Sequence, residues 1–431
     1  MSEFTSESST RTEFTVQGIP VSAIAAEHGT PCYVYDGAEL AARMRAVRTA
    51  LYPGLEVFYS LKANPNISIC ALLHENGARA EVSSLAELHT ALRAGVAPED
   101  ILFLGPGKSE AELRACLETG IHAIICESFG ELDRISALAA ESGVTARVVL
   151  RVNPDFAVKG SGLTMGGKPR QFGIDAAQLF EAEPLTRAHV RLIGVQVYMG
   201  TRILAEEPIA ENTRRILDLA QRLARHHRFE LELVDIGGGL GVAYFEKETD
   251  LDLDVLAGLL NPLLEKFAAD HPGTRLVMEL GRYLTATAGL YVTRVEYVKT
   301  SNGERFAVTD GGTNHHMAAV GIGSFVKRNF PMRVLGAAED AATEPWNVTG
   351  PLCTPNDTIG KKVALPAVEP GDLIGVLRSG AYGPSASPVH FLSHGHPAEV
   401  LVHEGRAHLI READGVEDLL GKQRLLIDKT H

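Results

Sequence analysis

Apolar runs and amphipathic segments alternate through the first two-thirds of this 431-residue chain. The segments between the runs, among them 84–96, 109–120, 129–143 and 212–227, place apolar residues three or four positions apart, and several end in glycine, so they predict helices. The apolar runs predict strands at 55–62, 78–84, 101–106, 122–128, 147–154, 192–200, 232–239 and 275–282.

Strands that alternate with helices predict a parallel sheet. Eight such units are what a closed (β/α)8 barrel requires, so we expect an α/β fold with a TIM-like barrel over 38–284. An open doubly wound sheet also alternates and is the alternative.

The pattern changes after residue 285. Runs at 289–300, 305–312, 372–383 and 398–412 are strand-like, are separated by turns and show little helical period. We therefore expect an antiparallel β-barrel or sandwich domain made of 14–37 and 285–420. The polar start, residues 1–13, is expected to be a disordered tail.

Composition narrows the function classes. The formal net charge of −13 argues against a nucleic-acid or anionic-membrane surface as the main partner, and no apolar run approaches the length of a membrane span. The cysteine number is odd and no pair has C-x-x-C spacing, which argues against a disulfide framework and fits a reducing cytoplasm. The five are Cys32, Cys70, Cys116, Cys126 and Cys353.

Charged residues and glycines collect at the ends of the predicted strands. In a barrel of this type, the chemistry lies at the carboxyl ends of the strands. Each such residue could be merely solvated, but together they indicate a site. They are Lys62, Glu81, Gly105, Glu127, Arg151, Tyr198 with Thr201, the glycines 237–239, and Glu279 with Arg282.

The sequence DIGGGLG lies at the end of the seventh predicted strand. Its glycines could form a plain turn, and the G-x-G-x-x-G spacing of a dinucleotide site is not met. We favour a phosphate site, because consecutive glycines can present backbone N–H groups to an anion and strands 7 and 8 form the usual phosphate site of a barrel. Arg282 can add a bidentate contact.

Lys62, a phosphate site and an acid, Glu279, together suggest pyridoxal phosphate. This cofactor needs a lysine to bond to its aldehyde, an anchor for its phosphate and a carboxylate beside its ring nitrogen. The carboxylate keeps the nitrogen protonated, so that the ring can accept electrons from the substrate.

The chain resembles the alanine-racemase-fold pyridoxal phosphate decarboxylases, the group of the diaminopimelate, ornithine and arginine decarboxylases. The resemblance runs from about residue 30 to about 412, and its motifs are YSLKAN, EVSSLAEL, GPGKS, LRVNP, QFGI, DIGGGLG, ELGR, GPLC and GAYG.

The resemblance implies a role for each matching residue. Lys62 carries the cofactor, Glu279 contacts the ring nitrogen, and Cys353 comes from a partner subunit of a homodimer to return a proton. The other cofactor-binding residues are expected to be Glu81, Arg151, Tyr198, Thr201, Gly237, Gly238, Gly239, Gly281, Arg282 and Tyr382. Burial as a small hydrophobe is the alternative for Cys353.

This sequence departs from the family at the substrate end. Tyr198 stands where a histidine usually stacks on the ring, and Thr201 replaces a serine. Thr354 replaces the Asp or Glu that grips a distal amine, and Ala318 lies near the place of an arginine that holds the distal carboxylate of diaminopimelate. We expect Asp310, Thr354 and His315 at the substrate. The pair His315 and His316 has no apparent third ligand, so we expect no metal.

The stretches at 160–175 and 314–317 are similar to the butirosin-pathway branch, which decarboxylates glutamate held as a thioester on a carrier protein. The resemblance therefore implies decarboxylation of a derivatised or carrier-bound amino acid, with Cys353 or Lys62 delivering the final proton. The alternatives are meso-diaminopimelate decarboxylase and, in another class, a non-catalytic pyridoxal phosphate carrier protein.

Overall fold

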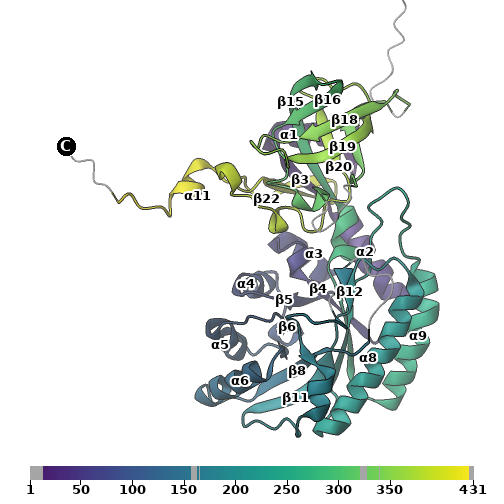
Figure 1. Ribbon diagram of the computed structural model, residues 1–431, viewed down its shortest axis with the longest axis vertical. Coiled ribbons are helices and arrows are strands. Elements are labelled where there is room, and N and C mark those ends of the chain that lie inside the picture. Colours follow the sequence, from purple (N-terminus) through teal and green to yellow (C-terminus); the bar gives the residue numbers. More distant parts are fainter. Residues whose placement is uncertain (1–12, 157–162, 165, 321–327, 339, 427–431) are drawn as a thin grey trace, which may run out of the picture. The chain divides into compact units, whose positions relative to one another are not determined.

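The computed structural model describes residues 13–156, 163–164, 166–320, 328–338 and 340–426. All of the expected tail except Glu13 therefore lies outside the described residues. The chain divides into two compact units (Figure 1), residues 39–286 and residues 1–38 with 287–431. We call them the barrel unit and the β unit. The sequence pattern had predicted 38–284 and 14–37 with 285–420.

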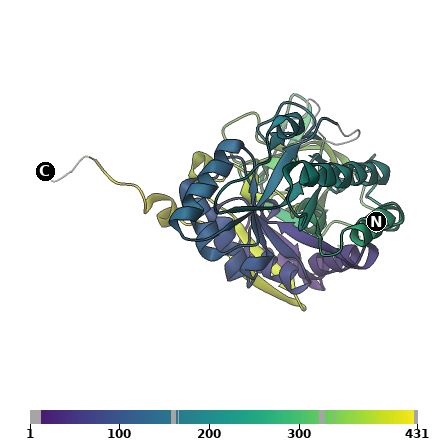
Figure 2. The ribbon, with the colours of Figure 1, turned by 90° about the horizontal axis from the view of Figure 1, so that it is seen from below.

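The barrel unit contains a closed ring of parallel strands. Their order is β8-β11-β13-β14-β4-β5-β6-β7, and a pairing between β7 and β8 closes it. Figure 2 shows helices around the strands. The predicted (β/α)8 barrel is confirmed, and the open sheet is excluded. The strands are β4 Leu55–Ser60, β5 Arg79–Val82, β6 Ile101–Phe103, β7 Ala123–Cys126, β8 Ala146–Asn153, β11 Val190–Gln196, β13 Leu233–Gly238 and β14 Arg275–Leu280.

Serine caps fix where several barrel helices begin. Ser84, Ser109 and Ser128 each accept a hydrogen bond from the backbone N–H three residues on, and Ser109 forms a full capping box with Glu112. The helices are α2 Gly37–Ala50, α3 Ile67–Glu75, α4 Leu85–Arg93, α5 Glu110–Thr119, α6 Phe129–Glu141, α7 Ala176–Glu181, α8 Glu206–His227, α9 Leu253–Asp270 and α10 Arg282–Thr285. Short strands β9 Leu163–Thr164, β10 Ile174–Asp175 and β12 Gly200–Thr201 complete this unit.

Apolar side chains from most of the strands form one buried cluster in the barrel. It comprises Phe58, Leu102, Leu104, Ala123, Ile125, Val149, Ile193, Leu233 and Val277. Burying a large apolar side chain stabilises a fold by about 1.5–3 kcal/mol. This cluster gives the strands a rigid core, and the candidate site is built on their carboxyl ends.

The β unit is a mixed sheet. Its path is β19-β18-β16-β15-β3-β21-β22, with β17 and β20 attached through β15. The expectation of antiparallel pairing is wrong for two pairs, because β16 with β18 and β21 with β3 run parallel. The strands are β1 Thr15–Val16, β2 Ile19–Pro20, β3 Cys32–Asp36, β15 Gly289–Ser301, β16 Glu304–Thr309, β17 Met332–Leu335, β18 Glu344–Thr349, β19 Thr358–Leu365, β20 Leu373–Val376, β21 Ala398–His403 and β22 Arg406–Arg411.

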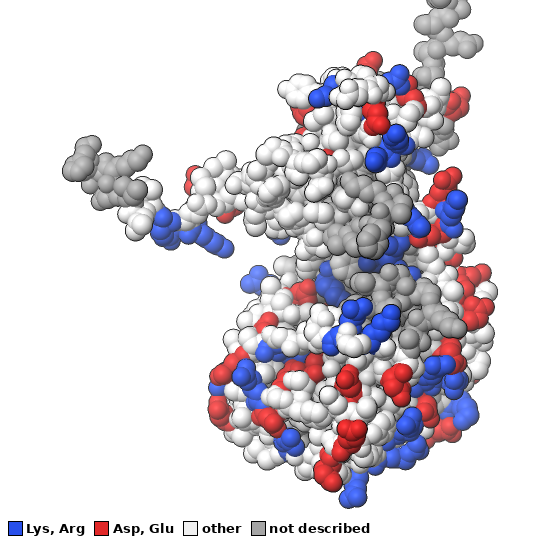
Figure 3. Space-filling model, viewed as in Figure 1, with Lys and Arg blue, Asp and Glu red and all other residues white. Residues whose placement is uncertain are grey.

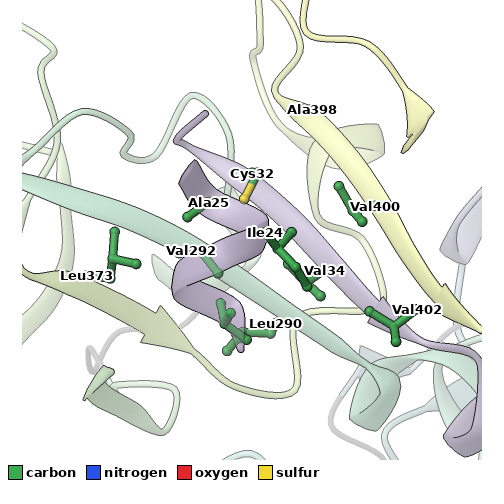
Figure 4. Packing of buried hydrophobic residues seen from close by; sticks show 11 residues of the cluster. Ile24, Ala25, Cys32, Val34, Leu290, Val292, Leu373, Ala398, Val400 and Val402 are labelled. Carbon is green, nitrogen blue, oxygen red and sulfur yellow. The ribbon is translucent and has the colours of Figure 1, made fainter. Parts of the chain in front are cut away.

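The N-terminal segment is part of the core of the β unit. Helix α1 (Val21–His28) contributes Ile24 and Ala25, and β3 contributes Cys32 and Val34, to a cluster with residues of β15, β20 and β21 (Figure 4). The side chains from the two ends of the chain interdigitate, so this unit needs both of them. A short helix, α11 Val416–Leu420, follows the last strand.

The surface carries charges of both signs. On the face in Figure 3, acidic and basic side chains are interspersed over the barrel unit. Helical pairs such as Arg114–Glu110 and Arg215–Glu211 account for part of this pattern. Within the described residues, the helices are too short or too polar to cross a membrane.

Candidate active site

Lys62 lies just beyond a strand, not at its end. Strand β4 stops at Ser60, and residues Leu61–Ala63 form one turn of 3-10 helix. Leu61 and Ala63 are buried on either side of Lys62. Because these neighbours anchor the turn, the lysine side chain is carried to the carboxyl end of the barrel, where its Nζ lies 6.0 Å from the centre of the Tyr198 ring.

The Lys62 amine meets a buried carboxylate. Its Nζ donates to Glu81 Oε2 over 2.8 Å, and Ser83 Oγ donates to Glu81 Oε1 over 3.2 Å. Burial alone would raise the pKa of Glu81, but Lys62, Ser60 and Ser83 together hold the pKa below its ordinary value. Glu81 is therefore an anion that orients the amine.

The three glycines at the end of β13, Gly237, Gly238 and Gly239, are required by close packing. A Cβ at Gly238 would meet the carbonyl oxygen of Glu279 at 1.7 Å, and a Cβ at Gly239 would meet that of Gly200 at 2.0 Å. Gly237 and Gly239 also have φ values of +67° and +88°. The Gly237 N–H donates to Asp235 Oδ1 over 2.8 Å, and a phosphate contact by Gly237 stays a prediction.

Glu279 and Asp235 form a pair of buried acids on neighbouring strands. Gln196 Nε2 donates to Glu279 Oε1 over 3.1 Å. Among the described atoms, neither Asp235 Oδ2 nor Glu279 Oε2 has a hydrogen-bond partner. Burial, followed by the charge of Glu81, raises the pKa of Glu279. A buried carboxylate oxygen of this kind can accept from a protonated ring nitrogen.

Gly281 and Arg282 follow β14 at the same end. A Cβ at Gly281 would lie 2.8 Å from the Ala63 side chain, so the glycine lets this turn pack against the Lys62 turn. Arg282 Nη1 donates to Tyr244 Oη over 3.0 Å. Thr201 belongs to β12, and its Cα would lie 3.5 Å from a Cβ at Gly239.

Arg151 has an internal partner. Its Nη1 pairs with Glu127 Oε1 over 2.8 Å, and both side chains are buried. Its guanidinium also stacks on Phe172, with 4.7 Å to the ring centre, and Glu127 accepts the N–H groups of Gly105 and Gly173. These contacts make Arg151 a fixed positive charge in the barrel, and a direct cofactor contact stays a prediction.

The remaining predicted residues lie in the β unit. Cys353 is exposed, whereas the other four cysteines are buried, and burial raises each of their pKa values to about 12. Thr354 follows Cys353 in a turn that a buried acid, Asp357, holds in place. Asp357 Oδ1 accepts from Thr313 N and Oγ1, and its Oδ2 accepts from Leu352 N. The sequence reasoning did not identify Asp357.

Asp310 and His315 are also bonded within the β unit. Asp310 Oδ1 accepts from Thr293 Oγ1 over 2.7 Å and from Arg294 N over 2.8 Å. The ring of His315 contacts the Gly395 carbonyl at 3.0 Å, and burial lowers its pKa to about 4. Both side chains have structural partners, so a substrate role for them stays a prediction. Tyr382 has a φ of 56°, which is uncommon for a residue with a Cβ.

Metal ligation has no support in the described part of the chain. It contains no group of three or more His, Cys, Asp or Glu side chains placed to hold a metal ion. The ring of His316 is fully buried and bonds to Ser379 Oγ at 2.8 Å, and burial lowers its pKa to about 3. His316 is therefore part of the packed interior.

The barrel residues fit pyridoxal phosphate. They provide a reachable lysine amine, a buried carboxylate oxygen for the ring nitrogen, and a glycine-rich turn beside an arginine. The carboxyl ends of neighbouring strands bring these groups together.

Comparison with known proteins also indicates a pyridoxal phosphate enzyme. Residues 37–286 match the family model of the pyridoxal-dependent decarboxylases, pyridoxal binding domain. The chain is 40% identical over 410 residues to the L-glutamyl-[BtrI acyl-carrier protein] decarboxylase of Niallia circulans, covering 94% of this chain and 96% of that one. It is 34% identical over 425 residues to the diaminopimelate decarboxylase of Pseudomonas aeruginosa, covering 96% and 97% of the two chains.

Solved structures agree in fold. The diaminopimelate decarboxylase of M. jannaschii in complex with L-lysine matches with a TM-score of 0.87 and 28% identity, covering 96% of each chain. The enzyme from Helicobacter pylori, also complexed with L-lysine, gives 0.83 and 29%, covering 93% of this chain and 98% of that one. The chain belongs to the pyridoxal-dependent decarboxylase family and has the alanine-racemase fold. It is a pyridoxal phosphate-dependent amino-acid decarboxylase.

Proposed function

We propose that this decarboxylase acts on an amino acid whose distal end is derivatised, such as glutamate held as a thioester on a carrier protein. The 40% identity to a decarboxylase of a glutamyl carrier protein supports this substrate class, because the similarity extends over both units. The observation that carries the proposal is a pocket in the β unit.

This pocket has a volume of about 470 Å³. None of its described lining residues is ionisable; they are Thr313, Met317, Val320, Leu352, Thr354, Asn356, Pro388 and Phe391. A distal ammonium or carboxylate buried here would lack an opposite charge, which costs several kcal/mol. An uncharged chain with amide or thioester groups avoids this cost, and the two threonines and Asn356 can hydrogen-bond to it.

The chemistry also fixes where the carrier would be attached. Decarboxylation requires a free α-amine and removes the α-carboxylate, so neither group can be in the link. For glutamate, only the side-chain carboxyl remains. The thioester would therefore replace the distal charge that diaminopimelate and ornithine enzymes must bind.

We assign each cofactor contact to a residue of the barrel. Lys62 would hold the aldehyde carbon, Glu279 the ring nitrogen, and Gly238, Gly239 and Arg282 the phosphate. When bound, pyridoxal phosphate supplies an electron sink for the bond between Cα and the carboxylate. Glu81 would orient the Lys62 amine as it leaves and returns. Tyr198, whose ring lies beside that amine, would cover one face of the cofactor.

Cys353 is our candidate for the proton donor to Cα, acting across a homodimer. Its exposure supports this assignment, because a thiol that reaches a partner subunit cannot be buried in its own. Tyr382 would contact the phosphate from the same region. Lys62 is the other candidate for the final proton.

Free meso-diaminopimelate is the second candidate substrate. The 34% identity to the Pseudomonas aeruginosa enzyme favours it. The uncharged pocket lining and Ala318, near the expected place of a distal arginine, do not. A direct comparison of rates separates the two substrates.

The test compares kcat/KM for free meso-diaminopimelate, lysine, ornithine and glutamate with that for a glutamyl γ-thioester. We expect the thioester to be preferred by about two orders of magnitude or more, since a misplaced buried charge is discriminated against this strongly. Thr354→Glu should lower the rate on the thioester and shift preference towards a distal amine, whereas the matched Thr354→Ser should change little. Efficient turnover of free diaminopimelate would instead favour the second candidate.

A further inference from the structure

Asp235 and Glu279 face each other inside the barrel. Their side chains are almost fully buried, with 0% and 2% of the residue surface exposed, and they lie on adjacent strands. Each has one oxygen with an N–H donor, because Gly237 N donates to Asp235 Oδ1 and Gln196 Nε2 to Glu279 Oε1. The other oxygen of each, Asp235 Oδ2 and Glu279 Oε2, is buried and has no hydrogen-bond partner among the described atoms.

The two cations that act on Glu279 are already paired with other carboxylates. Lys62 pairs with Glu81, and Arg151 pairs with Glu127. Among the described groups at this end of the barrel, no second lysine or arginine forms an ion pair with Asp235 or Glu279. Two adjacent buried carboxylates cannot both be ionised, because repulsion and loss of solvation add together. The pair therefore keeps at least one proton.

We propose that Asp235 carries this proton and donates a hydrogen bond to Glu279, and so acts as the positioning residue for the acid at the ring nitrogen. The inference rests on the proposed role of Glu279. Asp235 Oδ1 is already fixed by the Gly237 N–H, so Oδ2 is the oxygen left to carry the proton. Burial, followed by the charge of Glu279, raises the pKa of Asp235 well above its ordinary range. Lys62 and Arg151 favour the ionised form of Glu279.

This arrangement has two consequences for the cofactor. A hydrogen bond donated to Glu279 fixes the plane of its carboxylate and lowers its basicity, so the proton between Glu279 and the ring stays on the nitrogen. Asp235 would also link the glycine turn, through Gly237, to Glu279. A neutral hydrogen-bond donor at position 235 would therefore support Glu279. A second anion there would weaken the contact between Glu279 and the protonated ring nitrogen.

Two substitutions test whether Asp235 acts as a neutral hydrogen-bond donor or as an anion. Asp235→Asn keeps an acceptor for Gly237 N–H and an N–H donor for Glu279, so it imitates the protonated acid. Asp235→Leu has similar bulk and removes both bonds. We would record the infrared carbonyl band of a protonated carboxylic acid in the cofactor-free protein at neutral pH. The second readout is the ¹⁵N chemical shift of the ring nitrogen in protein loaded with labelled pyridoxal phosphate.

We expect a carboxylic acid band in the unmodified chain that is lost in Asp235→Asn, whereas a band from Glu87, whose pKa burial raises to about 7, should be common to both proteins. The ¹⁵N shift should stay that of a protonated nitrogen in Asp235→Asn and move towards the neutral form in Asp235→Leu. Cofactor affinity should fall about tenfold or more in Asp235→Leu, since a buried acceptor loses its donor. Absence of the band, or its survival in Asp235→Asn with loss in Glu279→Gln, would overturn the proposal.

The infrared result does not depend on the substrate or on the cofactor. A wrong proposed function would therefore leave it unchanged, and only a wrong assignment of the proton would alter it. If Asp235→Leu does not fold, the infrared comparison and the ¹⁵N shift of Asp235→Asn still decide the question. A ¹⁵N shift in Asp235→Asn typical of a neutral nitrogen would count against Asp235 as a neutral donor.

Discussion

Lys62 Nζ lies 2.8 Å from Glu81 Oε2, and the two side chains differ in exposure. The Glu81 side chain is completely enclosed, whereas 37% of the Lys62 side chain surface is accessible. A fixed buried anion thus holds an amine that a ligand can still reach. This relationship makes Lys62 our candidate for the lysine that bonds to the cofactor.

Lys62→Ala should abolish covalent attachment of pyridoxal phosphate, with loss of the yellow colour and of decarboxylation. Among the described residues, Lys62 is the lysine whose amine contacts Glu81 at this site. The matched control is Lys266→Ala, because Lys266 is exposed and its described ion pair is with Asp270 on its own helix. Borohydride reduction and peptide mapping provide the measurement. Labelling of a different lysine would show that the site is misassigned.

Glu279→Gln should leave the cofactor attached to Lys62 but lower kcat by about two to three orders of magnitude. An amide cannot keep a proton on the ring nitrogen, and one preorganised electrostatic contact is worth about this much. Steady-state rates and the absorption spectrum of the same preparation separate loss of chemistry from loss of cofactor. A kcat close to that of the unmodified enzyme would remove Glu279 from the mechanism.

Asp235→Asn should flatten the dependence of stability on pH. Burial raises the pKa of Asp235, so the folded chain keeps a proton that an unfolded aspartate loses above about pH 3.9. Because the folded state binds more protons, the free energy of unfolding should fall as pH rises. Removing the group should reduce this slope by up to about 1.4 kcal/mol per pH unit.

Urea denaturation of the cofactor-free protein at several pH values between about 5 and 8 measures this slope. Asp218→Asn is the control, since the side chain of Asp218 is 62% exposed. Equal slopes for Asp235→Asn and the unmodified chain would mean that Asp235 is ionised in the folded state.

Cys353→Ala and Lys62→Ala should each be inactive, and a mixture of the two should recover part of the activity. In a shared-site homodimer, a mixed dimer contains one site with both native residues. At full subunit exchange, about a quarter of the unmodified activity is the expected limit, because half of the dimers are mixed and each has one intact site. Native mass spectrometry checks the exchange. Lack of recovery after verified exchange would argue that Cys353 acts within its own chain.

The barrel could be predicted from the sequence because its signals are local. Each strand is a short apolar run, several helices have a serine cap or a glycine stop, and Lys62 and Glu279 follow from strand ends. The predicted strand ends differ from the observed ones where tertiary contacts determine the end of a strand. For example, β4 stops at Ser60 and the chain turns before Lys62. The parallel pairs in the β unit were missed because they join segments far apart in the chain.

The site residues that the sequence pattern does not reveal were missed for one common reason. Gln196 and Asp235 sit inside strands and look like ordinary polar positions, so only the pairing of β11, β13 and β14 reveals that they meet Glu279. The Arg151–Glu127 pair likewise depends on neighbouring strands. Asp357 is visible in the sequence as an acid four residues after Cys353. Its hydrogen bonds to Thr313 could not be predicted, because the two residues are 44 positions apart in the chain.

The substrate claim is tested most directly by intact-protein mass spectrometry of a carrier protein loaded with glutamate through its side-chain carboxyl. Incubation with the holoenzyme should lower the carrier's mass by one CO2, and Lys62→Ala should leave it unchanged. Free meso-diaminopimelate in a parallel reaction should release CO2 far more slowly. An unchanged carrier mass together with rapid release from diaminopimelate would contradict the account.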